Sequence, residues 1–298
     1  ERLALVIGLA VTLAMLGGMV AQTPFIWLAT HVGWRQTVFY DAAFGCFALA
    51  MIIWLVSDSP AGRYFKEAAT HTVGQVWGTF KQALSNRQNW LGGATISLLN
   101  LPIFIFGATW GVLYLTQVHH LTAYEASWVT SMLFVGMIVG SPLSGWFSDR
   151  YHFAYSGRKL CFASGGSRRQ PLMLSAALSL CLIIFLIGVT QLSLTSLLVV
   201  FFLMGLVSSA QVVGYPLVTE SNPGHLTASA SSISSMLIMG GGFILPVFGL
   251  LLSWLGDAQV VGHTTVYSLS DYRLGMALLP CAYVMAWFAA YHAKETLS

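Results

Sequence analysis

Polar side chains embedded in strongly apolar stretches are the residues of this chain that could do chemistry. Ser208, Gln211 and Tyr215 are spaced i, i+3 and i+7, so they share one face of a helix. Ser97 and Asn100 share a face in the same way. A polar group that faces lipid is costly, so we expect these side chains inside a helix bundle, where they either bind a polar solute or hold helices together.

Two further residues, Trp110 in a glycine-flanked stretch and Gln22, extend this set of candidate binding residues. Carboxylates are scarce in the apolar stretches: Asp41 lies about one turn inside one of them, and Glu220 lies at the end of another. An embedded carboxylate can take up a proton. Asp41 lies close to Arg35, however, which favours a position at the membrane interface for this side chain.

Catalytic and metal-binding motifs are absent from the sequence. It contains no H-E-x-x-H, G-x-S-x-G or P-loop pattern and no cluster of Cys and His. His119 and His120 would need further ligands to hold a metal, and we interpret them as a solvated pair. The cysteines lack metal-ligand spacing and are expected to be free thiols: Cys46, Cys161, Cys181 and Cys281. The sequence therefore predicts neither an enzyme nor a metal or other cofactor.

Composition places the chain in a membrane. Of its 298 residues 56% are hydrophobic and only 8% are charged, whereas about 25% are charged in soluble proteins. Mean hydropathy is +0.74. The first apolar stretch is too long for the core of a signal peptide, so we expect a true span. The net charge of +3 is spread over short loops, which argues against a nucleic-acid partner.

A membrane-spanning helix needs about 20 mostly apolar residues. Eight stretches qualify, which predicts an all-α polytopic membrane protein with spans near residues 4–28, 37–56, 91–115, 125–147, 171–190, 194–216, 229–255 and 273–292. The loop 149–169 carries five basic residues, which marks it as cytoplasmic, and alternation then places both termini inside. Of the 13 Lys and Arg residues only Arg35 and Arg273 fall outside, which supports this orientation in the inner cell membrane. In the fourth span, Gly136 and Gly140 have the GxxxG spacing that permits close helix packing.

An internal repeat divides the predicted helices into two sets. Paired glycines, a proline and a terminal glycine occur twice, at Gly17, Gly18, Pro24 and Gly33 and again at Gly240, Gly241, Pro246 and Gly256. The alternative is coincidence, because Gly and Pro are common in membrane helices. We expect residues 1–56 to be a two-span remnant of an N-terminal bundle that lacks four preceding spans, and 91–298 to be a complete six-span bundle. Residues 57–90 then form a cytoplasmic linker, in which 73–84 have the spacing of a helix on the membrane surface.

The loop after the fourth predicted span carries the most specific motif. It has a glycine, an acidic residue followed by a basic one, and then a later basic pair: Gly145, Asp149 and Arg150, with Arg158 and Lys159 or Arg168 and Arg169 as the pair. We favour the pair at 168 and 169 because Pro171 and the next span follow at once. In these residues the chain resembles the Major Facilitator Superfamily, and it looks like spans five to twelve of the twelve in that family. The residues between the two parts are an insertion relative to the family pattern.

The resemblance implies that this motif is a conformational latch, formed here by Gly145, Asp149, Arg150, Arg168 and Arg169. Asp149 is then expected to face the positive N-terminal end of the first span, near Arg2, and to favour the state closed to the cytoplasm. The alternative is that Asp149 is a solvated loop residue that affects only the membrane topology of the chain.

The resemblance also implies that the third and sixth spans line a central cavity. The preferred substrate contacts are then Asn100, Trp110, Gln211 and Tyr215, with Ser208 and Gln22 as further candidates.

The function implied by the resemblance is secondary active transport of a small organic solute by alternating access. We expect proton-coupled symport, with Asp41 and Glu220 as weak candidates for the proton carrier. The alternatives are export of a drug or siderophore by antiport and a non-transporting membrane sensor. The expected partners are the lipid bilayer, the solute and protons, and the expected state is a monomer.

Overall fold

The computed structural model describes residues 3–56, 73–156, 159–164, 166–254, 259–261 and 264–297. Within this part of the chain, seven helical segments are long and apolar enough to cross a membrane, and one bent pair of helices raises the number to eight. The spans are Leu3–Val32, Trp34–Leu55, Arg87–Leu99 with Ile103–Val118, Ala123–Arg150, Arg169–Gly188, Leu194–Glu220, Gly224–Trp254 and Leu269–His292. The predicted all-α polytopic membrane fold is therefore confirmed.

Most spans are built from more than one helix. The first two spans comprise α1 (Leu3–Val20), α2 (Thr23–Val32) and α3 (Trp34–Leu55), and α4 (Val73–Ser85) follows them. The third and fourth comprise α5 (Arg87–Leu99), η1 (Ile103–Trp110), α6 (Gly111–Val118) and α7 (Ala123–Arg150). The fifth and sixth comprise α8 (Arg169–Gly188), α9 (Leu194–Ser208), η2 (Ser209–Val213) and α10 (Gly214–Glu220). The last two comprise η3 (Gly224–Leu226), α11 (Thr227–Gly240), η4 (Gly241–Phe243), α12 (Ile244–Trp254), α13 (Leu269–Met276) and α14 (Leu278–His292).

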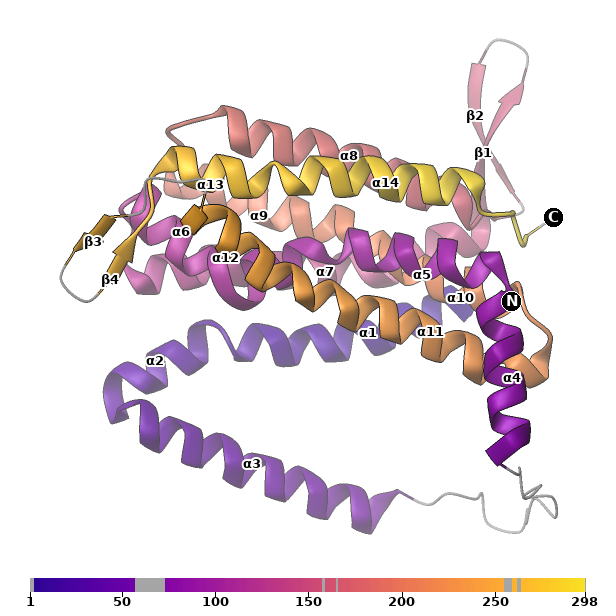
Figure 1. Cartoon of the computed structure of the whole chain (residues 1–298), viewed down its shortest axis with the longest axis horizontal. Helices are drawn as coiled ribbons and strands as arrows, with labels where there is room; N and C mark the ends of the chain where they lie inside the picture. The colour runs from indigo at the N-terminus through magenta and orange to yellow at the C-terminus, as the bar shows by residue number, and fades with distance from the viewer. Residues whose placement is uncertain are drawn as a thin grey trace.

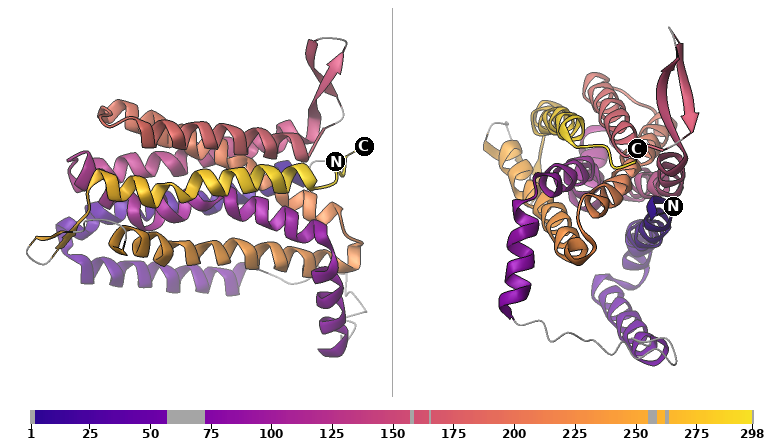
Figure 2. Two further views of the ribbon diagram at one scale, coloured as in Figure 1. Left: turned by 45° about the horizontal axis from the view of Figure 1, so that its top comes forward. Right: turned by 90° about the vertical axis from the view of Figure 1, so that its right-hand side faces the viewer.

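The six spans from α5 to α14 lie side by side as a bundle, and α1 lies along this bundle against α7 (Figure 1). α3 packs on α2 and is otherwise exposed, with Thr37 as its buried residue. Figure 2 shows the same separation of α3 from the bundle in an end-on view. Residues 73–85 of the predicted linker form α4, which runs crosswise to the spans (Figure 1), whereas the last residues of the linker, 87–90, already belong to α5. The rest of the linker, 57–72, lies outside the described residues.

Polar caps fix the helix starts at the end of the bundle that is remote from Asp149. At the start of α7, Thr122 Oγ1 accepts from the backbone N–H of Glu125, and the Glu125 carboxylate accepts from the backbone N–H of Thr122. Ser268 and Asp271 form the same capping box at the start of α13. Each box satisfies two backbone donors that the helix itself leaves unpaired.

Two hairpins and the length of the sixth span were not predicted. The insertion after Asp149 forms an antiparallel hairpin of β1 (Tyr151–Ser156) and β2 (Lys159–Ser164), and a second hairpin, β3 (Gln259–Val261) with β4 (Thr264–Val266), precedes α13. The sixth span, predicted to end near residue 216, extends to Glu220. Pro216 is tolerated because it lies in the first turn of α10, where backbone N–H groups have no helical partner.

Glycines let the helices around α7 approach to backbone contact. A Cβ at Gly136 or Gly140 would overlap backbone atoms of Phe202 and Leu206 in α9, which confirms the close packing predicted from their spacing. A Cβ at Gly205 of α9 would likewise overlap the Leu133 carbonyl of α7. The tightness of this contact means that even one added methyl group must push α7 and α9 apart.

We predict that Gly205→Val strongly destabilises the protein, because its branched side chain cannot fit against the Leu133 carbonyl. Overpacking of this kind costs about 1–3 kcal/mol. Thermal unfolding in detergent, followed by tryptophan fluorescence, should show a lower midpoint. Gly17→Val in α1 is the matched control, since nothing lies within 4 Å of a Cβ there. Equal midpoints for the two variants would contradict this account of the α7–α9 contact.

Candidate functional site

The third and sixth spans are both irregular in the middle, and their irregular parts meet. α5 ends at Leu99 with Asn100 as its C-cap, Pro102 follows, and the chain continues as the π-helix η1, so that the span bends by 42°. In the sixth span α9 tightens into the 3₁₀ segment η2 before α10 begins. Gln211 of η2 donates a hydrogen bond from Nε2 to Asn100 Oδ1 at 2.9 Å, and both side chains are buried. We call Asn100 and Gln211 the amide pair.

Buried polar atoms around the amide pair lack hydrogen-bond partners among the residues that the structure describes. Gln211 Oε1 and the hydroxyl of Ser208, on the preceding turn, are buried without a hydrogen bond. Leaving such a group unpaired costs about 1–3 kcal/mol. Tyr215, the third predicted residue of this face, is half-buried in α10. The amide pair and Ser208 can therefore accept or donate further hydrogen bonds to a polar solute.

The other predicted contacts lie elsewhere in the bundle. Trp110, at the far end of η1, packs on Phe248 and Tyr267, with ring centroids 5.5 and 6.1 Å from its own. Its Nε1 is buried and has no hydrogen-bond partner in the described part of the chain. Gln22 donates from Nε2 to the Gly107 carbonyl. Gln22 Oε1 accepts from Thr130 Oγ1 at 3.2 Å. Gln22 thus ties the junction of α1 and α2 to both η1 and α7.

A groove of about 880 Å³ lies between α5 and the α11–α12 span, and its lining includes Leu101, the residue that follows Asn100 in the chain. It is lined mostly by aliphatic and sulfur-containing side chains, among them Leu98, Leu101, Met236 and Met239. Ser97, predicted on the same face as Asn100, lines it too, and its hydroxyl donates to the Leu237 carbonyl at 2.8 Å. This groove offers an apolar surface next to the polar one.

An ion-pair cluster occupies the Asp149 end of the bundle. The Arg168 guanidinium, 2% exposed, lies 2.6 Å from Asp149 Oδ1 and 2.6 Å from Glu220 Oε1. Burial alone lowers the pKa of Arg168, but the hydrogen bonds and charges of Glu220 and Asp149 outweigh it and raise the pKa, so the side chain stays cationic. Asp149 Oδ2 also accepts from the backbone N–H of Leu5, in the first turn of α1, at 3.1 Å. Asp149 therefore joins α7, α1 and the start of α8.

The remaining motif residues have different environments. Gly145 allows the backbone of α1 to approach, because a Cβ there would overlap Ala4. Arg150 is exposed, with its guanidinium 5.8 Å from the centroid of Trp146, and Arg169 lies 5.4 Å from the ring of Tyr291. The structure thus pairs Arg168 with Asp149, while Arg158 and Arg2 lie outside the described residues.

The C-terminal segment completes the cluster and was not among the predicted site residues. The Glu295 carboxylate accepts from the Ser167 hydroxyl and from the backbone N–H groups of Arg168, at 2.8 Å, and Arg169, at 3.3 Å. Thr296 Oγ1 donates to Glu220 Oε2 at 2.6 Å. In the sequence these residues form only a short polar segment after the last span, and nothing in that segment indicated a partner for Glu295 or Thr296.

The candidate proton carriers are also placed by the structure. Glu220 belongs to the ion-pair cluster, and Asp41 is exposed on α3. Among the described residues, no group of three or more His, Cys, Asp or Glu side chains could hold a metal ion. His119 Nε2 instead lies 3.0 Å from the Tyr114 hydroxyl, and burial, followed by the charge of His120, lowers the pKa of His119.

Free thiols are confirmed at Cys46, Cys181 and Cys281, which are exposed. The side chain of Cys161 lies outside the described part of the chain.

Eight spans, a buried amide pair where two spans are irregular, and an ion-pair cluster at one end define a polytopic membrane protein of the transporter class. The family model described as Major Facilitator Superfamily matches residues 1–246 and 101–290, and the chain belongs to this family. The predicted resemblance is confirmed, and the protein is a membrane transporter of the superfamily. A comparison with curated proteins gives no significant match.

We predict that the C-terminal segment is released at acid pH. Burial raises the pKa of Glu295, but hydrogen bonds from Ser167 and the backbone of Arg168 and Arg169 outweigh it and lower the pKa below its ordinary value of 4.5. The stabilisation is therefore complete above about pH 4.5 and is lost as pH falls through the lower pKa of the folded protein.

A spin label on Leu297→Cys, in a background with the native cysteines replaced by serine, reports this release as faster label motion. We expect slow motion between pH 5 and pH 8, on the order of the rigid backbone, and faster motion only as the pH falls below about 4.5, through the lowered pKa of Glu295. Glu295→Gln should give fast motion at every pH, whereas Glu125→Gln, at the opposite end, should leave the label slow. A slow label in Glu295→Gln would show that the carboxylate does not hold this segment.

Proposed function

We propose that the protein moves a small polar or amphipathic organic solute by alternating access, as a proton-coupled symporter. The observation that supports this most directly is the amide pair with its unpartnered neighbours, Gln211 Oε1 and Ser208 Oγ, at the irregular centres of two spans. Transporters commonly form solute sites where helices are interrupted near the middle of the bilayer. The apolar groove between α5 and α11–α12 suits the hydrocarbon part of an amphipathic solute.

The two sets of helices are proposed to move against each other along α1 and α7. Residues 1–56 would move with one set and 91–298 with the other, linked by 57–90. The contact of Asp149 with Leu5 N–H ties the sets together at one end. The excess of basic residues at this end supports a cytoplasmic position for it and for both termini. The described arrangement is then the one tied at the cytoplasmic side.

Glu220 offers a way to couple protons to this motion. Its carboxylate pairs with Arg168, and a proton on it would remove one of the two anions that hold the buried guanidinium. Proton binding at Glu220 would therefore weaken the tied state. Asp41 is the second proposed carrier, supported only by its position as a carboxylate in an apolar span.

We predict that Gln211→Leu abolishes most solute uptake, because it removes the amide that bonds Asn100 and could bond the solute. Uptake by proteoliposomes would be measured across a panel of amino acids, sugars, carboxylates and dyes, with and without an imposed pH gradient. The expected loss is about tenfold, the equivalent of one hydrogen bond. Gln36→Leu, on exposed α3, is the matched control and should transport normally.

The direction of the pH effect tests the coupling. Uptake that rises when the side of entry is acid supports symport, and uptake that rises when that side is alkaline supports export by antiport. The result would argue for a non-transporting sensor if the native protein transports no member of the panel and Gln211→Leu binds the panel members as well as the native protein does.

We predict that Asp149→Asn increases the population that is open at the Asp149 end, because it removes the charge that faces Arg168 and the Leu5 N–H. Spin labels on exposed positions of α1 and α8, Val6→Cys and Leu174→Cys, would report the separation by double electron–electron resonance. The long-distance population should grow. Glu125→Gln, at the other end of α7, should leave the distribution unchanged. An identical distribution in Asp149→Asn would exclude a latch.

A further inference from the structure

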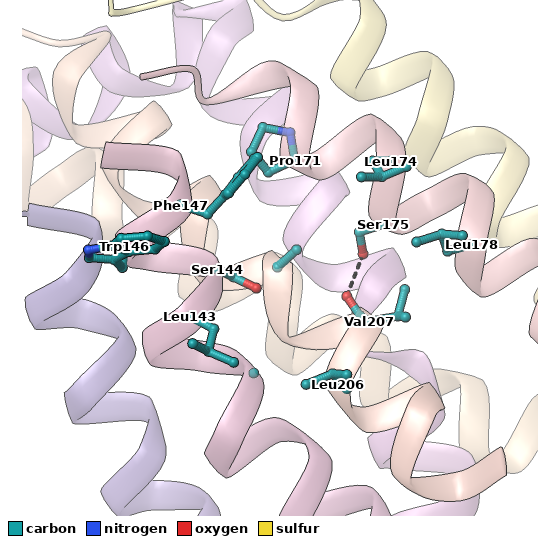
Figure 3. Close-up of a pocket in the computed structure, with 12 residues that line it drawn as sticks. Leu143, Ser144, Trp146, Phe147, Pro171, Leu174, Ser175, Leu178, Leu206 and Val207 are labelled. Atoms are coloured by element: carbon teal, nitrogen blue, oxygen red, sulfur yellow. Dashed lines mark hydrogen bonds between the residues drawn. The ribbon is translucent and has the colours of Figure 1, made fainter. Parts of the chain in front are cut away.

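A second, separate groove lies at the Asp149 end between α7, α8 and the junction of α9 with η2 (Figure 3). Its volume is about 400 Å³, within the range of roughly 300–1,000 Å³ that is typical of small-molecule sites. The walls are almost entirely hydrocarbon, formed mainly by Leu143, Trp146, Phe147, Leu174, Leu178 and Leu206.

The serine hydroxyls at this groove are already engaged. The Ser175 hydroxyl donates to the Val207 carbonyl at 2.7 Å, which Figure 3 marks with a dashed line. The Ser144 hydroxyl lies 3.1 Å from that of Ser209, which in turn donates to the Leu206 carbonyl. Since the serine hydroxyls are engaged and the rest of the lining is mostly aliphatic and aromatic carbon, the groove suits a hydrocarbon chain.

The rim of the groove faces outward from the bundle. Leu143 is 55% exposed, Leu174 and Leu178 are each 44% exposed, and Trp146 is 41% exposed. In a membrane protein, apolar side chains exposed on the outer face of a span contact lipid tails. The groove is therefore open to the bilayer along its length, and an acyl chain can enter it sideways.

A cation lies at one end of the groove. Arg150 ends α7 one turn after Trp146, with its guanidinium 5.8 Å from the centroid of the Trp146 ring. It is exposed, and it forms no ion pair with a carboxylate among the described residues, whereas the adjacent Asp149 is held by Arg168. Tyr151 packs on Trp146 with ring centroids 5.4 Å apart. Aromatic and basic residues at the end of a span are typical of the lipid headgroup level.

We propose that this groove is a binding site for an anionic phospholipid, whose acyl chain lies between α7 and α8 and whose phosphate binds the Arg150 guanidinium. A planar guanidinium can donate two parallel hydrogen bonds to a phosphate, and the hydrocarbon walls take up the chain. The proposal requires that the protein spans a membrane. It does not depend on the solute, the coupling ion or the direction of transport.

The test uses the full chain in nanodiscs that contain equal amounts of palmitoyl-oleoyl phosphatidylglycerol and phosphatidylcholine, with retained lipids counted by native mass spectrometry. The native protein should retain phosphatidylglycerol in preference to phosphatidylcholine. Arg150→Gln should reduce retained phosphatidylglycerol by about fivefold, as expected for one basic residue near the membrane surface, and leave phosphatidylcholine unchanged. Arg35→Gln is the matched control, because Arg35 is also exposed and lies 4.5 Å from a tryptophan ring, that of Trp34, at the other end of the spans.

A second variant tests the groove itself. Leu178→Trp should fill it and reduce retention of both lipids, while Ile184→Trp, on the same helix and also exposed, should have no effect. Equal retention of the two lipids by the native protein would overturn the proposal. So would unchanged retention in Arg150→Gln or in Leu178→Trp. A lipid-free dimer that Leu178→Trp dissociates would overturn it in favour of a second copy of the chain as the occupant.

Discussion

The buried guanidinium of Arg168 is the constraint on which this end of the molecule depends. A cation that is 2% exposed has lost its hydration and is stable only beside compensating anions. Asp149 at the end of α7 and Glu220 at the end of α10 supply them, each at 2.6 Å. Because the two acids come from segments far apart in sequence, satisfying one charge fixes the relative positions of α7, α8 and α10. The removal of either acid would leave a buried charge only partly compensated.

The same constraint links the charged end to the centre of the bundle. Glu220 is the last residue of α10, and Gln211 lies in η2, which runs directly into α10. A shift of η2 that breaks the bond between Gln211 and Asn100 therefore moves α10, and with it one of the two anions around Arg168. The connection is a short, continuous piece of helix. This gives a physical route by which events at the amide pair and at the ion-pair cluster could influence each other.

The sequence predicted the spans well because lipid leaves a chain few choices. Every backbone polar group within the bilayer must be paired, so an apolar stretch of sufficient length becomes a helix. The face that carries Ser208 and Gln211 was also readable from helical spacing. The partner was not, because Asn100 is 111 residues away and only the fold brings the two together. Glu295 was missed for the same reason, since the residues around a carboxylate on a terminal segment do not indicate which group it contacts. The spacing of residues gave no sign of the π-helix after Pro102 or of the hairpin after Asp149.

The hydrogen bonds between α1 and α7 differ in strength along the contact, and this difference affects which end opens. In the middle, a neutral hydrogen bond joins Thr12 of α1 to the Ile138 carbonyl at 3.1 Å, and beyond the far end of α1 another joins Thr23, the first residue of α2, to Ser131 at 2.9 Å. At the near end the acceptor is the charged carboxylate of Asp149. A neutral hydrogen bond contributes about 0.5–1.5 kcal/mol and one to a charged group about 1.5–3 kcal/mol. The helices are therefore held most strongly where Asp149 meets α1. Since this contact is electrostatic, a change of charge in the cluster can loosen it without altering the neutral contacts farther along the interface, such as Gly8 of α1, where a Cβ would overlap the Ser141 carbonyl of α7.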